Sequence, residues 1–421
     1  MRTPQELNPA ASGGMTRREL LCKTGSTALL LSALSIGLEG CGGGTGSALL
    51  PGTPFSEATR AKLDSALSRS RAALGIPGVV ASLFIPGEGL WESSVGIADK
   101  QTQQPMVAGM HTRIGSITKT FVVTAILQLA DEKSLNLGDP VAKYLDFVPN
   151  GANITLRMLA NMTSGLFSYT STETWLNAFF QNPQRRFTAR ELLDYGFNNP
   201  QKFSFEPPGS SIEYCNSNTL ILGLVVEKVS GIKIEDFVAQ RILAPLGLNN
   251  TSWPTNASMP SPLAHGYTEQ TLDDREVDST FWDPSWGGAA GMMISDLEDM
   301  KVWARALGEG TLLSAEMQRE RLTWAPYGSP TFKYGVGIGY YHGWIGHTGS
   351  LPGYNTAAFY LPQKRAVLVV QTNTDTRFVI TPGNPPVSME PVIGIIREIT
   401  KIVTPDDVPD GYDFLDEEFL S

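Results

Sequence analysis

Hydrophobic residues follow a strand-like pattern near both ends of the chain. Residues 79–85 and 90–97 are rich in apolar and β-branched residues, and Pro86-Gly87-Glu88-Gly89 separates them, which is typical of two strands joined by a turn. Near the other end the same criteria predict three more strands. These cover residues 334–341, 354–361 and 366–372.

Helical periodicity dominates the middle of the chain. Residues 116–132 are apolar on nearly every face, which predicts a helix buried inside the protein. The stretch from 136 to about 287 is mostly helical in pattern, with Pro, Gly and Asn turns. Further helices are predicted over 56–74, 218–229, 234–243, from the capping box Ser295-Asp296-Leu297-Glu298 to Leu307, and over 391–402.

These elements predict an α/β (α+β) fold. Adjacent short strands joined by hairpins imply an antiparallel sheet, which the terminal helices would cover. The helical stretch, about 136–287, would form a lobe inserted into the sheet domain of residues 56–403. A cleft between the two parts is a natural ligand site.

Composition excludes several classes of function. The 421 residues carry a formal net charge of -10 without clustered Lys and Arg, which argues against a nucleic-acid partner. The four histidines show no spacing typical of metal ligands, and there is no cysteine pair. We therefore expect neither a metal nor another cofactor. An anionic ligand would have to be held by local groups rather than by the overall field.

The N-terminal residues 1–41 are typical of an export signal. The segment 16–23, which contains Arg17-Arg18, resembles a twin-arginine signal, and an apolar run follows over 27–38. Leu38-Glu39-Gly40-Cys41 resembles a lipoprotein cleavage site with Cys41 as the lipidated residue, although Glu39 replaces the usual small residue. The alternatives are an ordinary cleaved signal and an uncleaved anchor.

This segment predicts a protein exported to the cell envelope, periplasm or extracellular space, attached to a membrane through Cys41. Residues 42–55, rich in Gly and Ser, are expected to be a linker. Residues 404–421 are expected to form an acidic tail.

One short motif begins the buried helix. In Ser116-Ile117-Thr118-Lys119 the lysine follows the serine by one helical turn, so its amine lies near the hydroxyl. A serine is a poor nucleophile until a neighbour takes its proton, and an amine at this spacing can do so. The same pattern recurs at Ser230-Gly231-Ile232-Lys233, where Gly231 breaks a helix instead of starting one.

Two further motifs follow in order, Tyr214-Cys215-Asn216 and His347-Thr348-Gly349-Ser350. With Ser-x-x-Lys, they resemble the serine β-lactamase and penicillin-binding-protein superfamily, in the branch of class C β-lactamases, D-alanyl-D-alanine carboxypeptidases and family VIII-like esterases. The resemblance covers roughly residues 57–400. It extends to residues 159–166 and to the turn 351–354.

The resemblance implies a role for each motif. Ser116 would attack a carbonyl carbon and become acylated, while Lys119 and Tyr214 would share the proton transfers. Asn216 would bind the acyl group's amide and restrain Lys119. The strand carrying His347, Thr348, Gly349 and Ser350 would bind substrate, and the N–H groups of Ser116 and Ser350 would form the oxyanion hole.

Some of these residues have structural alternatives. Asn216 is also a suitable N-terminal cap for the helix predicted from Asn218, and His347 could only pack or orient its neighbours. Cys215 is expected to be an inert core residue. Four further residues are candidates for the wall of the cleft: His111, Trp282, Trp286 and Tyr341.

Departures from the family pattern refine the hypothesis. There is no Ser-Asp-Asn triplet and no Gly-x-Ser-x-Gly elbow, which points away from class A β-lactamases and α/β-hydrolases. The strand before His347 has no arginine to bind a terminal carboxylate, which favours an esterase over a peptidase.

The sequence thus predicts an exported serine hydrolase that forms an acyl-enzyme on Ser116. We expect it to be D-alanyl-D-alanine carboxypeptidase-like or β-lactamase-like, and to act on a small-molecule, peptide or ester substrate. A carboxylesterase of the same fold and a non-catalytic binding lipoprotein are the alternatives.

Overall fold

A computed structural model describes residues 53–381 and 387–409, with side chains between 378 and 388 left out. The predicted export signal, Cys41 and the end of the tail lie outside these ranges, so export and lipidation stay predictions. Within the described ranges, no helix combines the length and the apolar character that a membrane crossing requires.

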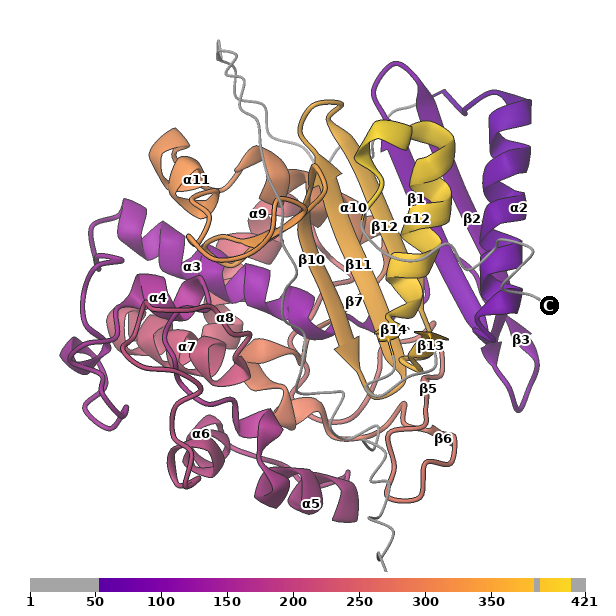
Figure 1. The fold of residues 1–421 in the computed structure, drawn as a ribbon. Coiled ribbons are helices and arrows are strands. Elements are labelled where there is room, and N and C mark those ends of the chain that lie inside the picture. The colour runs from indigo at the N-terminus through magenta and orange to yellow at the C-terminus, as the bar shows by residue number, and fades with distance from the viewer. Residues whose placement is uncertain (1–52, 382–386, 410–421) are drawn as a thin grey trace, which may run out of the picture.

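The main sheet joins both ends of the chain (Figure 1). In the described residues its strands are antiparallel and follow the order β3-β2-β1-β12-β11-β10-β9-β8. Val79 lies opposite Thr372, so the N-terminal and C-terminal strands are neighbours at the centre. The predicted antiparallel sheet is confirmed. The strands are β1 (Gly78–Ile85), β2 (Gly89–Asp99), β3 (Gln104–Pro105), β8 (Phe332–Tyr334), β9 (Gly339–Tyr341), β10 (Trp344–Leu351), β11 (Tyr354–Leu361) and β12 (Ala366–Thr372).

Each face of the sheet has its own hydrophobic core. Side chains alternate along a strand, so Val79 and Leu83 of β1 face one core and Val80 and Phe84 the other. The first core packs under the terminal helices α2 (Glu57–Ala73) and α12 (Pro391–Val403), as predicted. The second core lies under α10 (Leu297–Glu309) and continues into the helical part of the molecule.

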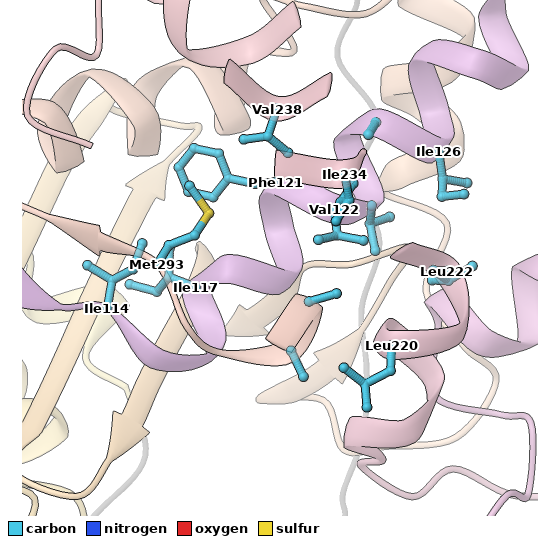
Figure 2. Packing of buried hydrophobic residues seen from close by; sticks show 14 of the residues in the cluster. Ile114, Ile117, Phe121, Val122, Ile126, Leu220, Leu222, Ile234, Val238 and Met293 are labelled. Atoms are coloured by element: carbon cyan, nitrogen blue, oxygen red, sulfur yellow. The ribbon is translucent and has the colours of Figure 1, made fainter. Parts of the chain in front are cut away.

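Helix α3 (Thr118–Asp131) runs through the second core (Figure 2). The ring of Phe121 stacks on Trp303 of α10 at a centroid distance of 3.8 Å, and the Trp303 indole donates a 2.8 Å hydrogen bond to Thr120 Oγ1. Ile117, Phe121 and Met293 lie together at the helix start in Figure 2. The prediction of a buried helix here is confirmed, and its burial fixes the position of the residues just before it.

The rest of the helical part surrounds α3. Between Gly247 and Met293 the chain forms only short helical turns and the β5–β6 ladder, so regular helix ends earlier than the predicted 287. The remaining helices are α4 (Leu156–Ala160), α5 (Glu173–Gln181), α6 (Ala189–Phe197), α7 (Asn216–Ser230), α8 (Ile234–Val238), the π-helical turn η4 (Ala239–Leu243), α9 (Ala244–Leu246) and α11 (Ala315–Arg321). The two-stranded ladders are β4 (Thr112–Arg113) with β7 (Ile294–Ser295), β5 (Tyr267–Thr268) with β6 (Val277–Asp278), and β13 (Phe378–Thr381) with β14 (Val387–Met389).

The strand predicted over 334–341 was wrong as a single element. It divides into β8 and β9 around a turn, in which Gly335 N donates to Ile338 O at 2.8 Å. Gly337 has a φ of 71°, which an L side chain rarely adopts, and a Cβ there would lie 2.4 Å from the Cβ of Val123. The turn therefore packs directly on α3. The strand prediction also missed β10, which carries the His-Thr-Gly motif.

Two predicted boundaries also differ. The N-cap of α10 is Asp296, whose side chain accepts a 2.9 Å hydrogen bond from Asp299 N, while Ser295 pairs with Thr112 in a strand. At the C-terminus, residues 404–409 belong to the packed structure rather than to a tail. Thr404 is buried, and the Trp344 indole donates a 2.9 Å hydrogen bond to Asp407 O.

The stacked pair of Phe121 and Trp303 gives a test of the core around α3. Phe121→Ala should lower the free energy of unfolding by about 3–5 kcal/mol, because it removes a fully buried ring and leaves a cavity. Urea denaturation monitored by circular dichroism measures this. Phe180→Ala, at a half-buried ring outside α3, is the control and should cost much less. Equal losses of unfolding free energy in the two variants would contradict the conclusion that Phe121 is a main contact of the core around α3.

Candidate active site

Ser116 lies in a single 3₁₀ turn, η1 (Gly115–Ile117), that leads directly into α3. The helix therefore starts at Thr118, and Lys119 follows the serine by three residues. The distance between Lys119 Nζ and Ser116 Oγ is 3.0 Å. The spacing in the sequence thus becomes a direct contact between a hydroxyl and an amine. The second Ser-x-x-Lys lies elsewhere, at the end of α7, where the Ser230 hydroxyl donates to Val226 O and Lys233 pairs with Glu227.

The amine of Lys119 is buried, and among the described residues its hydrogen-bond partners are three oxygens. Nζ lies 2.7 Å from Asn216 Oδ1 and 2.7 Å from Ala290 O, besides its contact with Ser116. No carboxylate pairs with it among the described residues. Removal from water therefore lowers the pKa of Lys119 well below its ordinary value. An amine in this state can accept a proton.

Asn216 is the first residue of α7, and Cys215 precedes it as the N-cap. Its amide contacts Lys119 through Oδ1, and its Nδ2 donates a 2.9 Å hydrogen bond to Thr170 Oγ1. Asn216 therefore contacts the amine of Lys119 rather than capping a helix that starts at Asn218. Cys215 is buried and has no cysteine partner in the described residues.

Tyr214 borders the site on the other side of Ser116. The residue is 37% exposed to the cleft, while its hydroxyl lies deeper, near the Ser116 hydroxyl. Burial of the phenol raises the pKa of Tyr214 well above its ordinary value, and Ser116 opposes this only in part. Lys119 Nζ lies 4.8 Å from the centre of the ring. Tyr214 is thus a neutral phenol, suited to give a proton rather than to take one first.

His347 faces two tyrosines that sequence reasoning did not connect with it. Its Nδ1 donates to Thr348 O at 2.5 Å, because a carbonyl oxygen can only accept, so Nε2 accepts from the Tyr334 hydroxyl at 2.9 Å. The ring also lies 6.1 Å from Tyr214 between centroids. Burial is the main cause that lowers the pKa of His347 to about 4, and repulsion from Lys119 in its protonated form adds to it. His347 is therefore neutral near pH 7.

Strand β10 approaches the nucleophile through its backbone. β9 pairs with β10 only as far as Gly346, so the following residues have a free edge toward η1. A Cβ on Gly349 would lie 1.9 Å from Ile114 O and 3.0 Å from Ser116 N. A Cβ on Gly115 would lie 2.8 Å from Ser350 N. Glycines thus bring the backbone nitrogens of Ser116 and Ser350 close together, the arrangement that an oxyanion hole requires.

A cavity of about 620 Å³ opens above Ser116. Thr348 and Ser350 line one side, as predicted, together with Tyr214 and Asn216. An aromatic wall lines another side, where Trp175 stacks on Phe179 with centroids 5.3 Å apart. Of the proposed wall residues, Trp286 and Tyr341 line the cavity, whereas His111 and Trp282 do not. The aromatic wall consists of Trp175, Phe179, Phe180 and Trp286, and Leu176 lines the cavity beside them.

Three charged side chains line this cavity among the described residues: Glu213, Arg377 and Glu390. Arg377 and Glu390 form an ion pair at 3.1 Å. The sequence analysis missed this pair because Arg377 follows β12 and Glu390 precedes α12, and no local pattern places either near Ser116. Tyr334 of β8 was missed for the same reason.

The comparisons with known proteins agree with this geometry. A family model described as Beta-lactamase matches residues 63–384, most of the chain. The chain belongs to the Beta-lactamase family. Its fold is that of the solved β-lactamase-like structures, which confirms the predicted fold class and the resemblance.

Several relatives of this Beta-lactamase family member are named for amide hydrolysis. D-aminopeptidase of Cereibacter sphaeroides (strain ATCC 17023) is 28% identical over 74% of this chain, but the match spans only 59% of that protein. A D-stereospecific amidohydrolase from Streptomyces sp. is 32% identical, with coverage of 75% and 94% and a TM-score of 0.67. D-amino acid amidase from Ochrobactrum anthropi SV3, in complex with L-phenylalanine amide, is 28% identical, with coverage of 76% and 92% and a TM-score of 0.68.

The low pKa of His347 makes a prediction about stability in acid. Because the unfolded histidine titrates near 6.5 and the folded one near 4, the unfolded state binds the proton first, and the free energy of unfolding falls as pH drops from 6.5 to 4. The loss should reach about 3 kcal/mol. His347→Gln, which can still accept from Tyr334, should lack this loss in urea denaturation at pH 4, 5, 6 and 7.

The wild type must be compared with His347→Gln because Asp375 changes the free energy of unfolding with pH in the opposite direction. Burial raises the pKa of Asp375 to about 6, so its own contribution to stability falls as pH rises from about 4 to 6. Both proteins share this contribution, and it cancels in the difference. A difference in unfolding free energy that does not change with pH would contradict the assignment of a neutral His347.

Proposed function

We propose that this protein is a serine amidohydrolase that cleaves amides of amino acids carrying a free α-amino group and a bulky apolar side chain. The observation that carries the proposal is the 3.0 Å contact of Ser116 Oγ with a buried, carboxylate-free lysine at the floor of the aromatic cavity. The names of the relatives suggest the D configuration.

The geometry supports a two-step mechanism. Ser116 Oγ attacks the amide carbon while its proton passes to Lys119, and the N–H groups of Ser116 and Ser350 bind the developing oxyanion. Tyr214, as a neutral phenol, gives a proton to the leaving amine as the C–N bond breaks, and Lys119 returns a proton to it. Water then attacks the ester carbon and gives a proton to the same groups, which pass a proton to Ser116 Oγ as the C–O bond breaks, so that the acid leaves and the free serine is restored.

The charges of the cavity favour this substrate over those of a carboxypeptidase or a β-lactamase. Penicillins and peptides with a free C-terminus carry a carboxylate, which needs a cation in the site. Arg377 is the single cationic side chain lining the cavity in the described ranges, and Glu390 pairs with it. With Glu213, the lining has a net negative charge, which favours an ammonium group. A neutral ester would also be accepted, so an esterase remains the second candidate.

Substrate turnover tests the proposal. Purified protein should hydrolyse D-phenylalanine amide at least about 100-fold faster, in kcat/KM, than nitrocefin or a D-alanyl-D-alanine peptide, and faster than L-phenylalanine amide. Ser116→Ala should lose all turnover, because the acyl-enzyme cannot form. Ammonia release and absorbance measure the rates.

Ser230→Ala, in the second Ser-x-x-Lys, is the matched control and should keep the wild-type rate. Fast hydrolysis of p-nitrophenyl butyrate without amide turnover would favour the esterase. Rapid nitrocefin hydrolysis would overturn the amidase proposal in favour of a β-lactamase. The absence of turnover and of any covalent adduct would favour a binding protein.

The charged pair gives a second, reciprocal prediction. Glu390→Gln should raise KM for D-phenylalanine amide about three- to fivefold, because it removes a negative charge near the bound ammonium and frees Arg377. Arg377→Gln should lower this KM, since it frees Glu390. KM for p-nitrophenyl butyrate, which is uncharged, should change little in either variant. Equal changes for both substrates would show that the pair acts through structure and not through charge.

A further inference from the structure

The segment 167–171, just before α5, is held tightly against the start of α7. Ser217 Oγ donates to Phe167 O and accepts from Tyr169 N, both at 3.0 Å. The Tyr169 hydroxyl donates to Trp286 O at 2.5 Å. These bonds fix the backbone of the segment and direct the hydroxyls of Ser168 and Thr170 toward Asn216.

The hydroxyls of Ser168 and Thr170 accept hydrogen bonds from the backbone and the side chain of Asn216. Its backbone N–H donates to Ser168 Oγ at 3.1 Å, and its Nδ2 donates to Thr170 Oγ1 at 2.9 Å. The two hydroxyl oxygens lie 2.9 Å apart, which closes a ring of hydrogen bonds. Thr170 therefore sits behind Asn216 as seen from Lys119, and it holds the amide group by its nitrogen.

Counting hydrogens shows why this orientation matters. A neutral lysine amine has two N–H groups and one lone pair. Asn216 Oδ1 and Ala290 O can only accept, so they take both hydrogens at 2.7 Å. The lone pair is then left for the third neighbour, the hydroxyl of Ser116 at 3.0 Å. Two fixed acceptors thus aim the base at the nucleophile.

A displaced or rotated Asn216 amide would undo this arrangement. With Nδ2 facing Lys119, the amide would present a donor, which competes with Ser116 for the lone pair. Thr170 holds Nδ2 on the far side, and so keeps Oδ1 toward Lys119.

We propose that Thr170 is a positioning residue for the proton transfer, which acts through Asn216 to direct the lone pair of Lys119 toward Ser116. This inference rests on the proposed role of Ser116 as the nucleophile. It concerns how the base is aimed and not which substrate is cleaved, so it can be tested without a natural substrate.

Labelling by a fluorophosphonate probe provides that test. In this reaction a bond forms between Ser116 Oγ and phosphorus, fluoride leaves, and the serine proton passes to Lys119. Thr170→Val keeps the shape of the side chain and removes its hydroxyl. The second-order labelling rate should fall about tenfold or more on its high-pH plateau, because the base is no longer aligned. The acid limb of the pH profile should move to lower pH, because the protonated amine loses a fixed acceptor.

Two further variants separate positioning from mere loosening of the segment. Thr170→Ser keeps a hydroxyl at this position and should show the wild-type labelling rate at high pH and the wild-type position of the acid limb. Thr172→Val is the matched control: its hydroxyl donates to Tyr169 O and caps α5, without contact to Asn216. It should lower the melting temperature and leave the pH profile unchanged.

The outcomes distinguish this inference from the function proposed above. If the wild-type protein is not labelled while Ser116 is intact, the nucleophile itself is wrong. If the wild type is labelled and Thr170→Val keeps its rate and profile, the nucleophile stands and the role of Thr170 is refuted. The same shift in Thr172→Val would also refute it, because the cause would then be loss of local rigidity.

Discussion

The structure depends on a lysine amine that is buried without a counter-charge. Lys119 is fully buried, and within the described ranges the hydrogen-bond partners of its Nζ are the oxygens of Ser116, Asn216 and Ala290. Burying a charged ammonium in this way is unfavourable, so burial lowers the pKa of Lys119 and favours the neutral amine. The three oxygens come from different parts of the chain, so α3, α7 and the turn at residues 288–290 must all pack correctly before the amine is placed. The helical region must therefore be packed correctly before the amine of Lys119 can be neutral and lie beside Ser116.

A second constraint is the close approach of the sheet to the backbone around Ser116. Backbone meets backbone where β10 passes the turn before α3, and no side chain fits at Gly115 or Gly349. Groups that would bind an oxyanion thus come from two structural units, the sheet and the helical part. Their alignment is independent of side-chain conformation. Side chains provide the walls of the cavity instead, through the aromatic residues of α5 and the charged pair before α12.

The sequence predicted what depends on local spacing and missed what depends on long-range packing. Ser116 and Lys119 are three residues apart on one turn, so their contact follows from helical geometry alone. The apolar composition of the segments that form β1, β11 and β12, and the turns between them, likewise identified the sheet. Tyr334 and Arg377 have no such signal. Each lies far from Ser116 in the sequence, and only the folding of the whole sheet brings it to the cavity. Turns were also hard to predict. The strand over 334–341 looked continuous in its composition, but a glycine with positive φ divides it, and its neighbour in space is α3 rather than another strand.

The order of strands in the sheet has a consequence for how the chain is made. β1 is synthesised well before its central neighbour in the sheet, β12, and Gly78 N donates to Asn373 Oδ1 across 295 residues of sequence. Until that late segment is synthesised, β1 and β2 form only a hairpin with one apolar edge uncovered. The helices that pack around α3, such as α7 and α8, all precede β12 in the chain and can gather around α3 before that strand is synthesised. The nascent chain must therefore keep the β1–β2 hairpin from pairing with a wrong partner while the residues between β1 and β12 are synthesised, and the central pair of strands forms only after β12 has followed.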